Sequence, residues 1–375
     1  MSTECFADRQ RPGAEAATEQ LQLRLHTRTP LYTGGIAQSG EQLQPAGLLG
    51  SIQRFSTLVA RTLGDDEFEQ RVWGNPGSAN AIPQAKQVAL GLDPAQLEPV
   101  NLPNRIQCER NEHTGKPRTW YFGQALQGPL GLTLTRNGIT EADWNLLKIA
   151  LRIQIRHATF GAKDQFGLGV LGAETLPPCQ PLGPEALLQE PSKQQPGLHN
   201  AALLHCTSEY ACPETRHDRL QAGLCWRAKL RDALRHLRED HHVPEGGAVL
   251  TDAMRHYLMG YLGGKGGGTT FGSAINISAL YPEGGGCALR VWGVFPHTTT
   301  EGDPPHPPGH PELTLDPRTL KSVLSTLIKV FNAPPELNTM PRLLQPSVTL
   351  NGRGSRARQD LPGWLNQLAG IEGTS

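Results

Sequence analysis

The sequence lacks an excess of charge of either sign, because its 375 residues contain 35 Lys and Arg against 35 Asp and Glu. A global basic field, which many isolated nucleic-acid-binding domains carry, is therefore missing, and any contact with a polyanion must come from a local patch. No apolar run approaches the roughly 18 residues that a membrane-spanning helix needs, and residues 1–20 contain no apolar signal core. We therefore expect a cytoplasmic protein that has no membrane partner.

Cysteine is sparse and irregularly spaced, with seven residues in the whole chain. An odd set without regular spacing argues against a disulfide framework and for a reducing compartment. The densest group of potential metal ligands combines His205, Cys206, Cys212 and His217. Zinc sites usually place roughly two to four residues between paired cysteines, whereas five separate Cys206 from Cys212. A polar loop is the favoured interpretation and no metal or other cofactor is expected, while zinc at this group stays an open alternative.

Aromatic residues make up only 6% of the chain, which contains 42 Gly and 31 Pro. This composition indicates ordinary cores separated by long irregular stretches rather than one compact unit. We expect residues 1–19 to be disordered, 80–118 to form an irregular insertion, 176–200 to be a linker, and 351–375 to be a basic tail.

Apolar periodicity returns between those stretches and follows the same plan twice. In residues 20–175 an alternating strand leads through a glycine turn to an amphipathic helix at 43–63, then to strands, a helix that begins at the capping pair Thr140 and Asp143, and a closing strand. Residues 201–350 repeat this order. We therefore predict an α+β protein with two tandem ferredoxin-like domains of βαββαβ plan and Pro/Gly-rich insertions. Four-stranded sheets of this kind commonly bind single-stranded RNA.

Two glycine-rich loops contain a lysine each. Residues 159–171 (TFGAKDQFGLGVL) place Lys163 and Gln165 among three glycines. Glycine tolerates positive φ and close backbone approach, so this loop is either a seat for a phosphate chain or a tight turn. In the second half, Lys265 lies among glycines, but Gly266 follows it where a Walker loop needs Ser or Thr, which excludes an ATP site of that type.

Arginines recur at helical spacing in both halves. Arg54 and Arg61 lie seven residues apart, on a face different from the apolar one. In the second half, four arginines follow one another at intervals of three and four residues, at 227, 231, 235 and 238. These patterns favour a nucleic acid or an acidic partner, although a solvated helix face would produce the same spacing.

Several segments together resemble the RAMP superfamily (repeat-associated mysterious proteins) of type III CRISPR systems. In the first half they are LRLHTRTPLYTGG, PAGLLGSIQRFSTLVA, VWGN and FGAKDQFGLGVL, and in the second half LCWRAKLRDALRHL and GGTTFGSAINISALYPEGGGCALRVWGVFP. The two-domain layout and the S-x-I-x-x-S-x-x-Y pattern before LRVWGVFP are similar to the first RAMP subunit of the Cmr complex.

The resemblance implies a non-catalytic, RNA-binding part of an antiviral ribonucleoprotein. Such a subunit contacts the guide RNA near its 3′ end, the single-stranded target RNA and other RAMP subunits. Catalytic relatives cut target RNA with an aspartate in the loop after the first strand. The corresponding residues 34–44 (GGIAQSGEQLQ) contain Glu41 but no Asp, so no catalytic residue and no enzymatic activity are expected.

The resemblance also implies RNA contacts residue by residue. The basic helix residue of the family corresponds to Arg54, its second-half counterpart to Lys229 or Arg231, and the basic residue of the loop to Lys163, whereas Gln165 departs from the common Arg or Ser. The residues expected to bind RNA phosphates are Arg54, Arg61, Lys163, Gln165, Arg227, Lys229, Arg231 and Lys265.

Two other functions remain open from the sequence. The first is a metal-independent endoribonuclease that processes guide precursor RNA, with His26 or His157 as a general acid or base. The second is a scaffold subunit that touches only protein.

Overall fold

The computed structural model describes most of the chain in fifteen segments. They are residues 19–34, 40–75, 84–103, 105–110, 116–119, 123–162, 166–191, 197–208, 212–237, 250, 258–259, 274–295, 317–332, 344–350 and 360–371.

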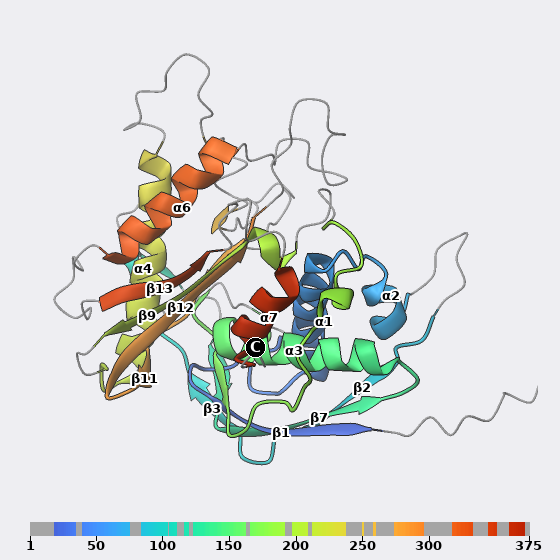
Figure 1. Cartoon of the computed structure of the whole chain (residues 1–375). Helices are drawn as coiled ribbons and strands as arrows, with labels where there is room; N and C mark the ends of the chain where they lie inside the picture. The colour runs from blue at the N-terminus through green and yellow to red at the C-terminus, as the bar shows by residue number, and fades with distance from the viewer. Residues whose placement is uncertain are drawn as a thin grey trace, which may run out of the picture.

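The first sheet contains four antiparallel strands in the order β2–β7–β1–β8. They are β1 (Gln20–Thr27), β2 (Val88–Asp93), β7 (Pro129–Arg136) and β8 (Leu171–Ala173). Strand β1 alternates strictly between exposed and buried positions, as its sequence predicted, because only one face of this sheet is covered. The cover consists of α1 (Pro45–Thr62) and α3 (Glu141–His157), which pack against each other (Figure 1).

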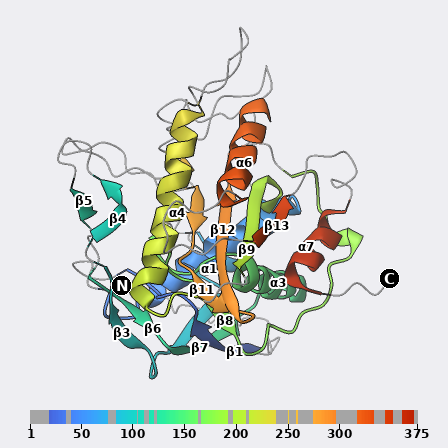
Figure 2. The ribbon, with the colours of Figure 1, turned by 90° about the vertical axis from the view of Figure 1, so that its left-hand side faces the viewer.

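The second sheet has the same kind of strand order, β10–β12–β9–β13, and is also antiparallel. Its strands are β9 (Ala201–Ser208), β10 (Ile275–Ile277), β12 (Gly286–Val294) and β13 (Leu344–Leu350), and β11 (Tyr281–Glu283) pairs with β12. Helices α4 (Arg216–His236) and α6 (Pro317–Asn332) lie side by side on one face (Figure 2).

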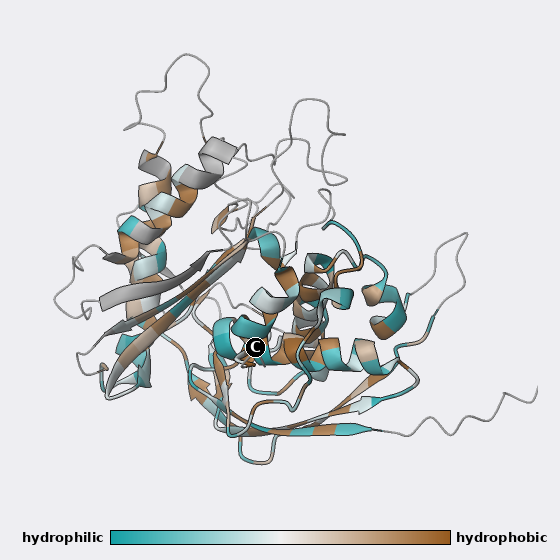
Figure 3. Ribbon diagram, viewed as in Figure 1, coloured by the Kyte–Doolittle hydropathy of each residue, from teal (hydrophilic) through white to brown (hydrophobic). Residues whose placement is uncertain are grey.

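The two sheets and their helices stack as four layers: first sheet, α1 and α3, second sheet, α4 and α6 (Figure 1). Strand β12 is buried at every position but its last, because its two faces point into two different cores. Leu203 and Trp292 belong to the core of α1 and α3, whereas Leu204 and Val291 belong to the core of α4 and α6. Apolar residues accordingly occur along these strands and on the helices between the sheets (Figure 3).

The region predicted to be an irregular insertion, 80–118, contains three strands, so that prediction is wrong. Strand β2 is an edge strand of the first sheet. Val88 is its only fully buried residue, and Leu90 and Leu92 pack partly buried against the first core. The local signal was therefore no more than a short alternation of apolar residues. The other two are β3 (Glu98–Asn101), which pairs with β6 (Gln124–Gln127), and β4 (Arg105–Arg110), which pairs with β5 (Pro117–Thr119).

Short helices complete the described part: α2 (Phe68–Trp73), the 3-10 turns η3 (Pro184–Ala186) and η4 (Leu198–Asn200), and α7 (Leu361–Ala369). Although α7 is at the end of the chain, it packs on α3 and contributes Leu365 and Leu368 to the first core. Among the described helices, none combines the length and apolar character needed to cross a membrane. The predicted α+β class with antiparallel sheets is confirmed.

Candidate nucleic-acid interface

The glycine-rich loop after α3 folds back on the segment that follows β1. The φ angles of Gly161, Gly167 and Gly169 are 85°, 90° and 87°, the left-handed conformation that glycine adopts without strain. The amide of Gly169 donates to Pro30 O at 2.8 Å, and the amide of Ala162 donates to Tyr32 O at 2.7 Å. These loop amides are therefore used inside the chain, as in the tight-turn interpretation. Lys163 and Gln165 lie outside the described residues.

The same loop also joins the two sheet-and-helix units. The amide of Ala279, just beyond β10, donates to Gly167 O at 2.9 Å. Gly223 on α4 approaches the same segment, since a Cβ built there would lie 2.5 Å from Ser278 O. Both helices contain the tripeptide Ala-Gly-Leu, at 46–48 in α1 and at 222–224 in α4. Gly47 on α1 approaches Thr33 in the same way as Gly223 approaches Ser278.

On α1, the two predicted arginines have different surroundings. Arg54 is exposed, and its guanidinium carbon lies 5.2 Å from the centre of the Trp292 ring on β12. Arg54 therefore stands at the seam between the two units. Arg61 forms an ion pair with Glu69, at 3.3 Å between Nη2 and Oε2, so a carboxylate already offsets its charge.

The predicted basic stripe on α4 is mostly not a surface stripe. Arg227 is only 5% exposed, donates to Met259 O and lies over the Phe166 ring at 5.0 Å, so it does not line an accessible groove. Lys229 and Arg231 are half-buried. The helix lies between the second sheet and strand β4, so more of its circumference is covered than the spacing of its arginines suggested. Lys265 lies outside the described residues.

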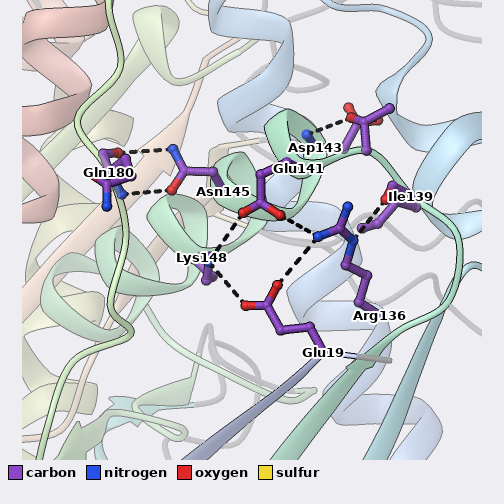
Figure 4. A network of polar contacts seen from close by, with 9 residues as sticks. Glu19, Arg136, Ile139, Glu141, Asp143, Asn145, Lys148 and Gln180 are labelled. Atoms are coloured by element: carbon purple, nitrogen blue, oxygen red, sulfur yellow. Dashed lines mark hydrogen bonds and ion pairs between the residues drawn. The ribbon is translucent and has the colours of Figure 1, made fainter. Parts of the chain in front are cut away.

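Other cations of the first unit are held by carboxylates. Arg136 forms ion pairs with Glu141 and with Glu19, and Lys148 lies 3.5 Å from Glu19 and 4.0 Å from Glu141 (Figure 4). This network joins the end of β7 to the first turns of α3. Its charges are balanced locally, so it offers little attraction to a polyanion.

The two histidines of the nuclease alternative do not come together. His26 is exposed on the uncovered face of β1. His157 is at the end of α3, on the covered face, where its Nε2 donates to Leu368 O at 3.0 Å. Burial, partly opposed by this hydrogen bond, lowers the pKa of His157 to about 4.

His157 should make stability depend on pH. Its pKa is about 4 in the folded chain and about 6.5 in an unfolded one, so the unfolded state binds more protons between these values. The free energy of unfolding should therefore fall by about 2 kcal/mol as pH drops from 6.5 to 4. His157→Gln keeps a donor for Leu368 O but does not titrate. Urea titrations at several pH values in this range should show a smaller fall in the free energy of unfolding for the variant than for the wild type. An equal fall in the two proteins would contradict the assignment.

A polar cluster at the seam was missed from the sequence. Arg28, just beyond β1, contacts Glu283 Oε1 at 3.1 Å, and His205 Nε2 contacts Glu283 Oε2 at 2.8 Å. The hydrogen bond from His205, helped by Arg28 and opposed by burial, lowers the pKa of Glu283 to about 2. The Tyr281 hydroxyl lies 3.5 Å from His205 Nε2. The only signal for this cluster in the sequence was that Tyr281 and Glu283 are two residues apart on one strand.

The group considered for zinc does not converge in the structure. His205 points to Glu283, whereas its neighbour Cys206 is fully buried in the second core and His217 is exposed on α4. Within the described segments, no three side chains of metal-binding type form a possible site.

The expectation that the cysteines are unpaired is wrong for Cys108 and Cys225. They form a disulfide, with Cα atoms 5.2 Å apart, that connects β4 to α4 across 117 residues of sequence. Spacing could not reveal this pair, because it depends on where β4 lies in the folded chain.

Comparisons with known proteins give matches only among solved structures. No family model matches the sequence, and no curated protein matches it. Cmr1 from Pyrococcus furiosus, in its apo form, has a TM-score of 0.42 and 10% identity, covering 82% of this chain and 96% of that one. A chain of the type III-B Cmr-beta complex, bound to cognate target RNA and AMPPnP in the presence of single-stranded DNA, has the same TM-score and identity, covering 82% and 98%.

Proposed function

We propose that this chain is a non-catalytic, RNA-binding RAMP subunit of a type III CRISPR effector complex. It would contact the guide RNA near its 3′ end and the single-stranded target RNA, beside other RAMP subunits. The sequence segments quoted above support this proposal. So does the strand order of both sheets, second–third–first–fourth in each βαββαβ unit, which is the ferredoxin-like arrangement of such domains.

The observation that carries the RNA assignment is the position of Arg54. It is an exposed cation at the seam of the two units. One turn earlier, Gly50 is exposed, and a Cβ built on it would meet nothing within 4 Å, so a nucleic-acid backbone has room to approach. The loop that contains Lys163 is linked to the segment on which α1 packs. The amide of Ala162 in this loop donates to Tyr32 O, and Gly47 on α1 packs against the next residue, Thr33.

We therefore assign the first-unit phosphate contacts to Arg54, Lys163 and Gln165, and the second-unit contacts to Lys229, Arg231 and Lys265. Arg61 has a secondary role because Glu69 offsets its charge, and Arg227 has a packing role. Phosphate contacts of this kind set affinity and register, while guide–target pairing reads the sequence. The absence of Asp from residues 34–44 favours a subunit that does not cut the target.

The test is the salt dependence of RNA binding. Replacing Arg54 with Gln should weaken binding of a single-stranded RNA and reduce the log–log salt slope by about 0.7, the value for one lost phosphate contact on a single strand. Filter binding over a salt series measures both. Arg54→Lys should keep the slope because it keeps the charge.

Arg61→Gln is the matched control on the same helix, and we expect it to change the slope less because Glu69 already pairs with Arg61. Equal slopes for the wild type and Arg54→Gln, with native circular dichroism, would remove Arg54 from the interface. Crosslinking to guide RNA in the assembled complex separates this function from a protein-only scaffold. Incubation with precursor RNA in EDTA separates it from a metal-independent nuclease.

A further inference from the structure

An arm of the first unit reaches across to the second unit. The arm consists of residues 98–127, in which β3 and β6 form the base and β4 and β5 form the tip. The amides of Leu31 and Leu126 each donate to the carbonyl of the other residue, at 2.7 and 2.9 Å, which joins the base to the segment after β1. The tip lies beside α4, apart from the two large sheets (Figure 2).

The base of the arm is held by apolar packing as well as by hydrogen bonds. Leu102 and Ala125 are buried in a small core that also contains Leu220 and Leu224 of α4. The amide of Leu102 donates to Gly123 O at 2.9 Å, which closes the base beneath the tip. The base therefore has contacts with both units that do not require a covalent link.

The tip has less support of this kind. In the described part of the chain, β4 and β5 pair only with each other, and an isolated two-stranded hairpin is at best marginally stable in water. The tip is joined to α4 by the disulfide between Cys108 and Cys225. One turn earlier on the same face of the helix, Gln221 Nε2 donates to Arg105 O at 2.6 Å. The order of the tip should therefore depend on the disulfide.

The two sulfur atoms of this bond differ in their exposure to solvent. Cys225 is only 6% exposed within the second core, whereas Cys108 is half-buried and packs against that core. A dissolved thiol can therefore reach the Cys108 side of the bond more easily than the Cys225 side. Disulfides in reducing compartments are usually transient or redox-sensing, and exposed disulfides are the ones that are reduced most readily.

We propose that the Cys108–Cys225 disulfide is a redox-sensitive link, and that a dithiol reductant opens it and releases the tip of the arm from α4. A reductant thiolate attacks Cys108 Sγ, the S–S bond breaks, and Cys225 leaves as a thiolate that takes up a proton. The second thiolate of the reductant then attacks the reductant sulfur of the mixed disulfide and displaces the Cys108 thiolate, which is protonated in turn. Two electrons pass to the protein, and the reductant becomes a disulfide. The base of the arm stays packed.

Hydrogen–deuterium exchange of the full-length chain, in its oxidised form and after reduction with dithiothreitol, tests the proposal. Peptide mapping without reductant first establishes the link between Cys108 and Cys225. We expect the amides of β4 and β5 to exchange at least about tenfold faster after reduction, because the free energy that a disulfide contributes then no longer opposes local opening. The amides of β6 and β12 should exchange at unchanged rates, since their packing does not depend on the bond.

Two variants separate the disulfide from other effects of the reductant. Cys108→Ser changes the half-buried member of the pair, and its β4 and β5 amides should exchange at the rate of the reduced wild type whether or not dithiothreitol is present. Cys179→Ser is the matched control, because Cys179 is also a half-buried cysteine but has a free thiol. This control should keep the full response of the wild type to reduction.

Three results would overturn the proposal. The first is that the protein prepared without reductant yields no peptide pair joined through Cys108 and Cys225. The second is that β4 and β5 exchange equally fast in the oxidised and the reduced protein. The third is that β12 also exchanges faster after reduction, which would show that the bond supports the whole second unit instead of holding the tip of the arm.

Discussion

Replacing Arg290 with alanine should lower the free energy of unfolding by about 3–5 kcal/mol, because buried polar groups lose their partners and a cavity opens. Arg290 is on β12 and is 5% exposed. Its Nη1 donates to Ile155 O at 2.7 Å and Ala158 O at 3.3 Å, and its Nε donates to the Tyr281 hydroxyl at 2.9 Å. The Arg290 side chain, which belongs to the second unit, thus caps the C-terminal end of α3 in the first unit, where a cation is favourable.

Urea denaturation of the wild type and the variant measures this effect. Arg290→Lys should recover part of the loss, because a lysine keeps the charge but cannot supply the same fork of donors. Arg24→Ala is the matched control, since Arg24 is also a strand arginine but is exposed, and it should change stability by less than about 0.5 kcal/mol. A loss below about 1 kcal/mol in Arg290→Ala would show that the seam does not depend on this contact.

The second large effect concerns Arg71 on α2. Its Nη2 contacts Asp65 Oδ2 at 2.7 Å and Asp143 Oδ1 at 2.8 Å, and both carboxylates are buried. Arg71→Ala leaves two buried carboxylates side by side without a cation. We expect a loss of about 3 kcal/mol at pH 7, somewhat less than for a fully buried pair because the Arg71 side chain is 39% exposed.

The loss should come from repulsion between the two buried carboxylates, which the Arg71 guanidinium offsets in the wild type. Adding Asp143→Asn to Arg71→Ala removes this repulsion and should restore part of the stability at pH 7. Urea denaturation of the wild type, the single variant and the double variant measures the effect, and a double variant no more stable than Arg71→Ala would contradict the explanation.

Local chemistry predicted the elements whose signals are local. The capping pair placed the start of α3: Thr140 Oγ1 accepts from the Asp143 amide at 3.1 Å, and the helix begins at Glu141. The helix predicted over 43–63 is Pro45–Thr62. Glycine tolerates positive φ, and all three loop glycines have it. In each case the deciding interaction lies within a few residues of sequence.

The candidate interface was less predictable, because exposure depends on what packs from elsewhere. Helical spacing could place Arg227 on one face of α4, but it could not show that this position is buried in the folded chain. Arg54 and Arg61 looked equivalent, and only the fold sets Glu69 beside one and Trp292 beside the other.

The sequence by itself determined the α+β class, the alternation of β1, the extent of α1 and the start of α3, since these follow from periodicity, capping and backbone sterics. Only the tertiary structure decided that the second sheet is covered on both faces, that Cys108 meets Cys225, and that Arg290 caps a helix of the other unit. Those outcomes depend on contacts between residues about a hundred or more positions apart, which no local pattern in the chain encodes.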